Sequence, residues 1–169
     1  CRPWQQRVPL RLAFMCGLMV AILNLVTDNA TFGDGKDPAY ALLHGFAEPQ
    51  WTYGIAKWLS TFFTYLCGIP GGLFSPSLSA AAGLAAAFHG WLPGVSVPEL
   101  ALLGMVGYMA GMTQSPITAL VITLEMTGNH SFAIPLVAVA FVGAGVAKQI
   151  APGLYETLAT IRYASSVNR

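Results

Sequence analysis

A glycine- and proline-rich break inside a long uncharged stretch constrains this chain more than any other feature. The segment from Gly68 to Ser77 contains three glycines, two prolines and two serines. No Asp, Glu, Lys or Arg occurs from Trp58 to Pro98, so the break lies in a segment suited to hydrocarbon or to a protein interior. Irregular backbone at that depth is tolerated only where it is buried in protein or lines a polar cavity. The break is therefore either a buried turn between helices or one wall of such a cavity.

A helix is expected to restart at about Leu73, directly after the break. The first N–H groups of a helix have no partner within the helix, and its dipole places roughly half a positive charge at that end. A bare helix N-terminus at membrane depth is a site suited to an anion. The residues alone do not identify that anion.

Composition indicates an integral α-helical membrane protein. Charged residues make up 9% of the chain, whereas a soluble domain carries about a quarter. A net charge of +1 gives no basic surface for nucleic acid. The cysteines and histidines are scattered and match no metal-ligand spacing, so neither a metal site nor a disulfide is expected. Cys16 and Cys67 are expected to be small buried hydrophobic residues.

The sequence is expected to be a fragment of a longer protein. It opens with Cys1-Arg-Pro-Trp, without an initiator Met or a targeting pattern. No soluble linker or second domain is visible, so residues 1–169 are assigned to one membrane domain.

About eight helices are expected, several of them far from the ~20 residues of a simple membrane span. The expected helices cover residues 12–26, 39–46, 51–67, 73–91, 98–112, 116–126, 131–148 and 154–163. Asp37 and Ser115 are expected N-caps, and a polar loop is expected at Thr27–Lys36. Proline stands at or near the start of five helices, as Pro38, Pro49, Pro76, Pro98 and Pro116. Short, tilted and re-entrant helices are typical of transporters and channels with a site in the membrane.

Small and basic residues give two further expectations. The run Ser79–Ala87 and the weak motif Gly107-x-x-x-Gly111 predict close helix packing. Arg11 and Lys57 are expected to extend their charged ends to a membrane interface.

Three stretches together resemble the CLC family of chloride channels and proton-coupled chloride transporters. Gly71-Gly-Leu-Phe-Ser-Pro76 looks like the family's G-x-F-x-P signature at a helix N-terminus. Residues Gly104–Thr127 are similar to a helix pair that ends in a Leu-Glu-Met-Thr-like sequence, and Pro152–Glu156 looks like the Leu-Tyr of the last membrane helix. Their order and spacing make the resemblance specific. It covers the whole chain and corresponds to the C-terminal half of the family's membrane domain.

The resemblance implies a chloride site at the restarting helix. The backbone N–H groups of Leu73 and Phe74 would bind a dehydrated chloride, and the hydroxyl of Tyr155 would donate to the same ion. Amides and a phenol donate without adding a full charge, which suits an ion that must also be released. The residues that would support this pore loop are Gly71, Gly72, Ser75 and Pro76, the glycines because they permit close backbone approach. Taken alone, Tyr155 is better explained as an interfacial anchor, since tyrosine is enriched at membrane interfaces.

The resemblance also implies partners. It predicts a multi-pass homodimer in a bacterial inner or plasma membrane, with a pore in each subunit and an interface near residues 115–126 and 131–148. The opposite wall of the pore and the gating glutamate belong to the family's first half, so the sequence leaves channel and antiporter open. An intramembrane acid is a functional candidate by default, but in the family the position of Glu125 is structural. No cofactor beyond the transported chloride is expected, and the protein is not expected to be an enzyme.

Two other functions compete with chloride transport. A secondary transporter of another anionic solute would also use a broken helix, but it would need a larger cavity and often an Arg. None of the eight basic residues lies in the central break. A membrane scaffold that transports nothing would not need the central glycines. The sequence therefore favours a voltage-gated chloride channel or a chloride/proton antiporter.

Overall fold

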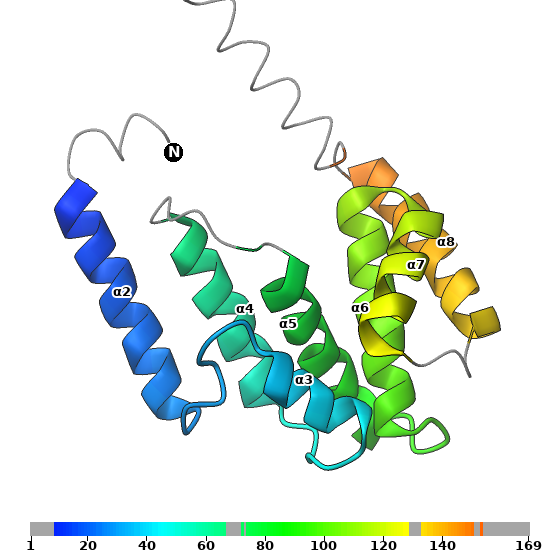
Figure 1. The fold of residues 1–169 in the computed structure, drawn as a ribbon, viewed down its shortest axis with the longest axis horizontal. Coiled ribbons are helices and arrows are strands. Elements are labelled where there is room, and N and C mark those ends of the chain that lie inside the picture. Colours follow the sequence, from blue (N-terminus) through cyan, green and yellow to red (C-terminus); the bar gives the residue numbers. More distant parts are fainter. Residues whose placement is uncertain (1–8, 67–71, 73, 129–132, 151–152, 154–169) are drawn as a thin grey trace, which may run out of the picture. The chain divides into compact units, whose positions relative to one another are not determined.

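The computed structural model describes residues 9–66, 72, 74–128, 133–150 and 153, and within these ranges the chain is helical without a β-strand. The helices are α2 (Pro9–Val26), α3 (Lys36–Leu43), α4 (Trp51–Leu66), α5 (Phe74–Ala86), the 3-10 helix η1 (Ala87–Gly90), α6 (Val97–Thr113), α7 (Pro116–Thr127) and α8 (Ala133–Ile150) (Figure 1). The predicted all-α class is confirmed. The helix expected at residues 154–163 lies outside the described residues. The chain divides into two compact units, residues 1–101 and 102–169, with the boundary inside α6.

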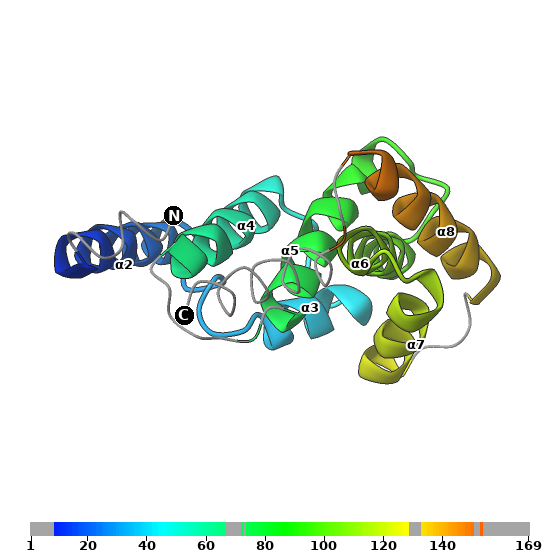
Figure 2. The same cartoon turned by 90° about the horizontal axis from the view of Figure 1, so that it is seen from above.

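In the first unit, α4 lies between α2 and α5, and α3 packs against α5 (Figures 1 and 2). Helices α4 and α5 cross where glycines meet: a Cβ atom added at Gly54 would lie 2.6 Å from the backbone nitrogen of Leu84. A Cβ added at Gly83 would lie 2.6 Å from Cδ1 of Tyr53. The small residues of α5 are buried at this contact, as the run Ser79–Ala87 predicts.

In the second unit, α7 packs against α8, and α6 approaches α8 at another pair of glycines. A Cβ added at Gly143 would lie 2.7 Å from the carbonyl oxygen of Gly107, and one added at Gly111 would lie 3.6 Å from that of Gly143. The glycine motif of α6 therefore faces α8, which confirms the predicted close packing.

The sequence predicts where helices start, through their prolines, more accurately than it predicts where they end. Pro116 is the first residue of α7 and Ser115 is its N-cap, as predicted. The N-cap of α3 is Gly35 rather than Asp37, because the left-handed backbone of Gly35 (φ 80°) turns the chain into the helix two residues earlier than expected. Helix α5 was expected to continue to Trp91, but it ends at Ala86 and tightens into η1. Such 3-10 turns are frequent at helix ends.

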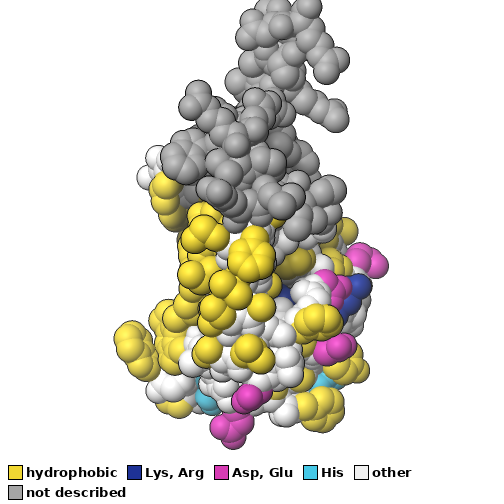
Figure 3. All heavy atoms as spheres, turned by 90° about the vertical axis from the view of Figure 1, so that its left-hand side faces the viewer, with side chains coloured by type: hydrophobic (Ala, Val, Ile, Leu, Met, Phe, Trp, Pro, Cys, Tyr) yellow, Lys and Arg dark blue, Asp and Glu magenta, His cyan; other side chains and the backbone are white. Residues whose placement is uncertain are grey.

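Apolar side chains cover the outside of several helices. Among the described residues, α8 has the length and hydropathy to cross a membrane by itself, whereas residues 13–26 of α2, α6 and α7 are apolar but shorter. The large exposed apolar side chains of α2 are Phe14, Met15, Leu18, Met19, Ile22, Leu25 and Val26. Figure 3 looks onto the side where α2 lies, and hydrophobic side chains cover much of that surface. In water such a surface would be unfavourable, whereas lipid or apolar protein can cover it.

Candidate anion site at the start of helix α5

The start of α5 combines unpaired donors with a favourable dipole. The helix begins at Phe74, within one residue of the predicted restart, and Pro76 is its third residue. Proline has no N–H, so the first turn presents the N–H groups of Phe74 and Ser75 without partners inside the helix. Together with the positive end of the helix dipole, these groups suit an anion.

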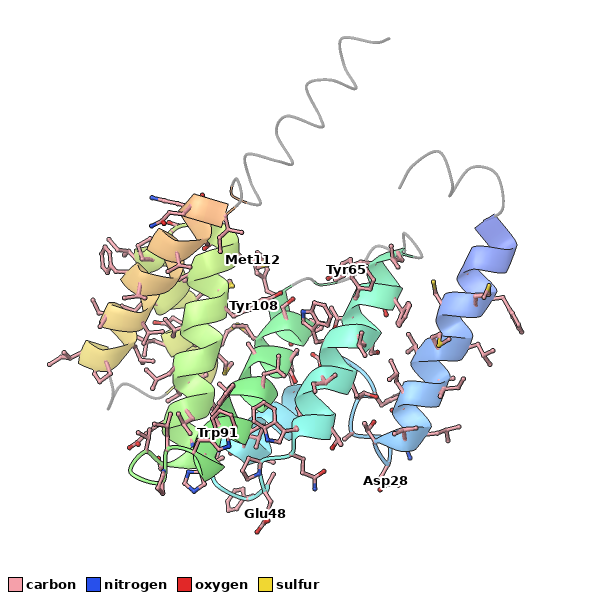
Figure 4. The ribbon with its side chains drawn as sticks, turned by 180° about the vertical axis from the view of Figure 1, so that it is seen from behind. Asp28, Glu48, Tyr65, Trp91, Tyr108 and Met112 are labelled. Carbon is pink, nitrogen blue, oxygen red and sulfur yellow. The ribbon has the colours of Figure 1, made fainter. Side chains whose placement is uncertain are left out.

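The structure describes four of the seven residues that the sequence predicted for this site: Gly72, Phe74, Ser75 and Pro76. Gly71, Leu73 and Tyr155 lie outside the described residues. No described atom lies within 4 Å of the point where a Cβ of Gly72 would stand. The Tyr65 hydroxyl donates to the carbonyl oxygen of Gly72 at 3.0 Å and ties the break to the end of α4 (Figure 4).

A cavity of about 240 Å³ lies beside this helix start. It is lined by α4, by the loop before α3 and by the start of α5, through residues Gly33, Asp34, Lys57, Ser60, Thr61, Thr64, Tyr65, Gly72 and Pro76. Most of these side chains carry hydroxyl or charged groups. Among the described residues of the break, Gly72 and Pro76 line this cavity, which favours the second of the two alternatives that the sequence left open.

Lys57 is a residue whose role the sequence did not reveal. The expectation that it reaches an interface is wrong, because its side chain is only 2% exposed. Its Nζ donates to the carbonyl oxygens of Thr31 and Gly33, at 2.9 and 2.8 Å. A buried ammonium requires such partners. These acceptors are backbone groups, which leave no signal in the sequence.

The loop before α3 also contacts α5. The Ser79 hydroxyl donates to the carbonyl oxygen of Gly35 at 2.8 Å and is hydrogen-bonded to the Tyr53 hydroxyl of α4. The Ser75 hydroxyl lies 3.5 Å from Oδ2 of Asp34. The predicted polar loop therefore packs on two helices with its residues 31–35.

Asp34 places a carboxylate near the start of α5. The Lys36 ammonium lies 3.1 Å from Oδ2 of Asp34, and the Lys36 backbone N–H donates to Oδ1. The hydrogen bond with the Lys36 side chain lowers the pKa of Asp34 below its ordinary value. The carboxylate is therefore charged at neutral pH, and Lys36 offsets its repulsion of an anion.

Glu125, Cys16 and Cys67 are the other residues that the sequence singled out. Glu125 is exposed on α7. Cys16 is buried, as predicted, while Cys67 lies outside the described residues. Within the part of the chain that the structure describes, no three His, Cys, Asp or Glu side chains form a group that could hold a metal ion.

Comparison with known proteins identifies the family. A family model described as voltage gated chloride channel matches residues 1–148. The chain belongs to this family. Membership confirms the CLC resemblance, with two of its three motifs inside the matched residues, and places the chain in a membrane protein.

Curated relatives of this CLC chain are much longer than the chain itself. A protein of Cronobacter sakazakii named H(+)/Cl(-) exchange transporter ClcA is 33% identical over 112 residues, which cover 62% of this chain and 24% of the relative. A protein of the same name from Yersinia pestis is 30% identical over 158 residues, which cover 85% of this chain and 31% of the relative. The chain thus spans about a quarter to a third of the length of these relatives. No solved structure matches significantly.

Proposed function

We propose that the protein to which this chain belongs moves chloride across a membrane, as a voltage-gated channel or as a chloride/proton antiporter. The observation that carries the proposal is the start of α5 at Phe74, inside the signature Gly72–Pro76 and beside a polar cavity. Family membership and the printed names of the relatives support the same function.

In the proposed site, chloride accepts hydrogen bonds from the backbone N–H groups of Leu73 and Phe74 and from the hydroxyl of Tyr155. Gly71, Gly72, Ser75 and Pro76 shape the loop around the ion. The contact between Ser75 and Asp34 supports a role in holding the loop rather than the ion. Transport then consists of binding and release between helix ends, without covalent chemistry and without a cofactor.

The proposed protein is a multi-pass homodimer of a bacterial inner or plasma membrane. Its subunit interface uses α7 and α8, near residues 115–126 and 131–148. Large apolar side chains are exposed on both helices, which supports this assignment; they include Ile117, Val121, Met126, Ile134, Phe141 and Val142. The opposite wall of the pore comes from the part of the family's membrane domain that this chain does not span.

Another anionic solute is the alternative cargo, and the buried cation beside the cavity is the observation in its favour. Two features weigh against it. Two of the donor directions of Lys57 are taken up by the carbonyl oxygens of Thr31 and Gly33. The cavity of about 240 Å³ is also smaller than the roughly 300–1,000 Å³ of typical small-molecule sites. Chloride fits this volume without further opening.

Substitution of Tyr155 in the full-length protein tests the site. We expect Tyr155→Phe and Tyr155→Ala to weaken chloride affinity by about tenfold, because each removes a hydrogen bond to a charged ligand. Titration calorimetry measures the affinity, anion flux in liposomes measures selectivity, and size-exclusion chromatography checks the dimer.

Tyr108→Phe is the matched control, because Tyr108 is an exposed tyrosine of α6 outside the proposed site. Unchanged chloride affinity and unchanged anion selectivity in both Tyr155 variants would contradict the proposed site.

A further inference from the structure

We propose that Lys57 and Ser79 are positioning residues for chloride binding. Both hold the loop Thr31–Gly35, and through this loop they fix the start of α5 against α4. We call this arrangement, formed by residues 31–35 with Lys57 and Ser79, the loop clasp. The inference rests on the proposed chloride site at the start of α5.

The first half of the loop clasp is an ammonium group inside the protein. Lys57 stands in the middle of α4, and its Nζ bonds two carbonyl oxygens of one short loop, those of Thr31 and Gly33. Hydrogen bonds from a charged donor are roughly twice as strong as neutral ones. If the loop moved away, the ammonium would stay buried without these partners. The loop is therefore held firmly on α4.

The second half is a hydroxyl that joins three elements. Ser79, 2% exposed, belongs to α5, donates to the carbonyl oxygen of Gly35 and is bonded to the hydroxyl of Tyr53 on α4. Gly35 takes a φ of +80°, and a Cβ added there would lie 2.3 Å from the Ser79 hydroxyl. The loop backbone thus touches α5 directly, at a position that admits no side chain.

These contacts are made to the early turns of α5. Ser79 follows Phe74 by five residues, which is about 7.5 Å along the helix axis. Ser75 contacts Asp34 of the same loop, and Pro76 shares its cavity with Lys57. Because a helix moves as a rigid body, a shift of the loop clasp also moves the N–H groups of the first turn. Hydrogen bonds weaken steeply with poorer geometry, so the shift lowers chloride affinity.

Lys57 also carries a positive charge, which would attract chloride even without the loop clasp. Ser79 separates the two explanations, because its hydroxyl is neutral and acts only through its hydrogen bonds to Gly35 of the loop and to Tyr53 of α4. Positioning predicts that removal of either residue weakens binding. Attraction by charge predicts that only removal of Lys57 does so.

The test uses the full-length protein with the variants Lys57→Met, Lys57→Arg and Ser79→Ala. Chloride affinity is measured by calorimetry on folded dimer, anion selectivity by liposome flux, and stability by thermal unfolding. We expect Lys57→Met and Ser79→Ala each to weaken chloride affinity by at least about fivefold, the lower end of typical coupling between sites. Lys57→Arg retains most of the affinity, because a guanidinium group can donate to both carbonyl oxygens.

Thr123→Val is the matched control, because among the described residues the buried Thr123 hydroxyl bonds only the carbonyl oxygen of Ala119 in its own helix. We expect it to leave chloride affinity unchanged. Should Lys57→Met fail to fold, Ser79→Ala carries the test. Wild-type chloride affinity in folded Ser79→Ala, even with lower thermal stability, would overturn the proposal. An unmodified protein that binds no chloride would instead overturn the proposed function, and this inference with it.

Discussion

Gly35 is a residue that cannot be replaced without cost. Its φ of +80° lies in the left-handed region, and a Cβ there would meet Oγ of Ser79 at 2.3 Å and Cε of Lys57 at 2.8 Å. We expect Gly35→Ala to destabilise the protein by about 1–3 kcal/mol from backbone strain alone, with the steric clash added to it. Thermal unfolding of the purified protein in detergent measures the loss.

Gly45 provides the control for that substitution. It also has a positive φ, +71°, but no described atom lies within 4 Å of its Cβ position. We therefore expect Gly45→Ala to lower the free energy of unfolding by about 1–2 kcal/mol, through backbone strain without a steric clash. Equal losses at both positions would contradict the tight contact between the loop and α5.

Single residues were predicted well where they belong to a motif and poorly where their partners are backbone atoms. The signature around Phe74 lies at a helix start, as its sequence indicates. The environment of Lys57 was missed, because the carbonyl oxygens of Thr31 and Gly33 are acceptors that any two residues would supply. Tyr155 stays a prediction, since it lies outside the described residues.

At the scale of elements, the contact between α4 and α5 depends on the absence of side chains. A Cβ added at Gly54 would lie 2.6 Å from the backbone nitrogen of Leu84, and backbone cannot rotate away as a side chain can. We expect Gly54→Ala to cost about 1–3 kcal/mol, the usual range for overpacking. Thermal unfolding in detergent measures this cost, and chloride calorimetry shows whether α5 has shifted.

Gly145→Ala on α8 is the matched helical control. No described atom lies within 4 Å of its Cβ position, so the substitution should stabilise α8 by up to about 1 kcal/mol through helix propensity. A Gly54→Ala variant as stable as Gly145→Ala would show that α4 and α5 are less tightly packed than the structure indicates.

Helix starts were predictable because proline and capping residues mark them locally. Ser115 and Pro116 predict the start of α7 without error. The start of α6 differs by one residue from the prediction. The end of α5 was not predictable in the same way. The change into η1 follows a run of small residues interrupted only by Leu84, in which no residue marks the boundary.

At the scale of the whole molecule, the chain spans only about a quarter to a third of its curated relatives. We expect the 169-residue chain alone to carry no chloride flux, because one wall of the proposed pore is absent from it. Flux assays compare liposomes containing the purified chain with empty liposomes and with liposomes containing the full-length protein. Chloride flux from the chain near that of the full-length protein would contradict the proposal that it forms one wall.

The class of the molecule could be predicted from composition, because a content of only 9% charged residues is typical of a membrane protein. Which distant segments contact each other could not be predicted from composition. Close packing at Gly107 was expected from its spacing to Gly111, but its partner on α8, Gly143, becomes apparent only in the structure. Periodic patterns mark a contact face, whereas the partner depends on the path of the chain.

The buried Lys57 also has a consequence for biogenesis. A lysine at the centre of a helix opposes insertion into the membrane by about 2.5–3.5 kcal/mol. Helix α4 carries no other charged residue, and the loop that accepts from Lys57 precedes it in the chain, so the acceptors have been synthesised by the time α4 emerges from the ribosome. We expect α4 to insert stably only once residues 31–35 have docked on Lys57. Because these residues are synthesised before α4, the order of synthesis matches this order of assembly.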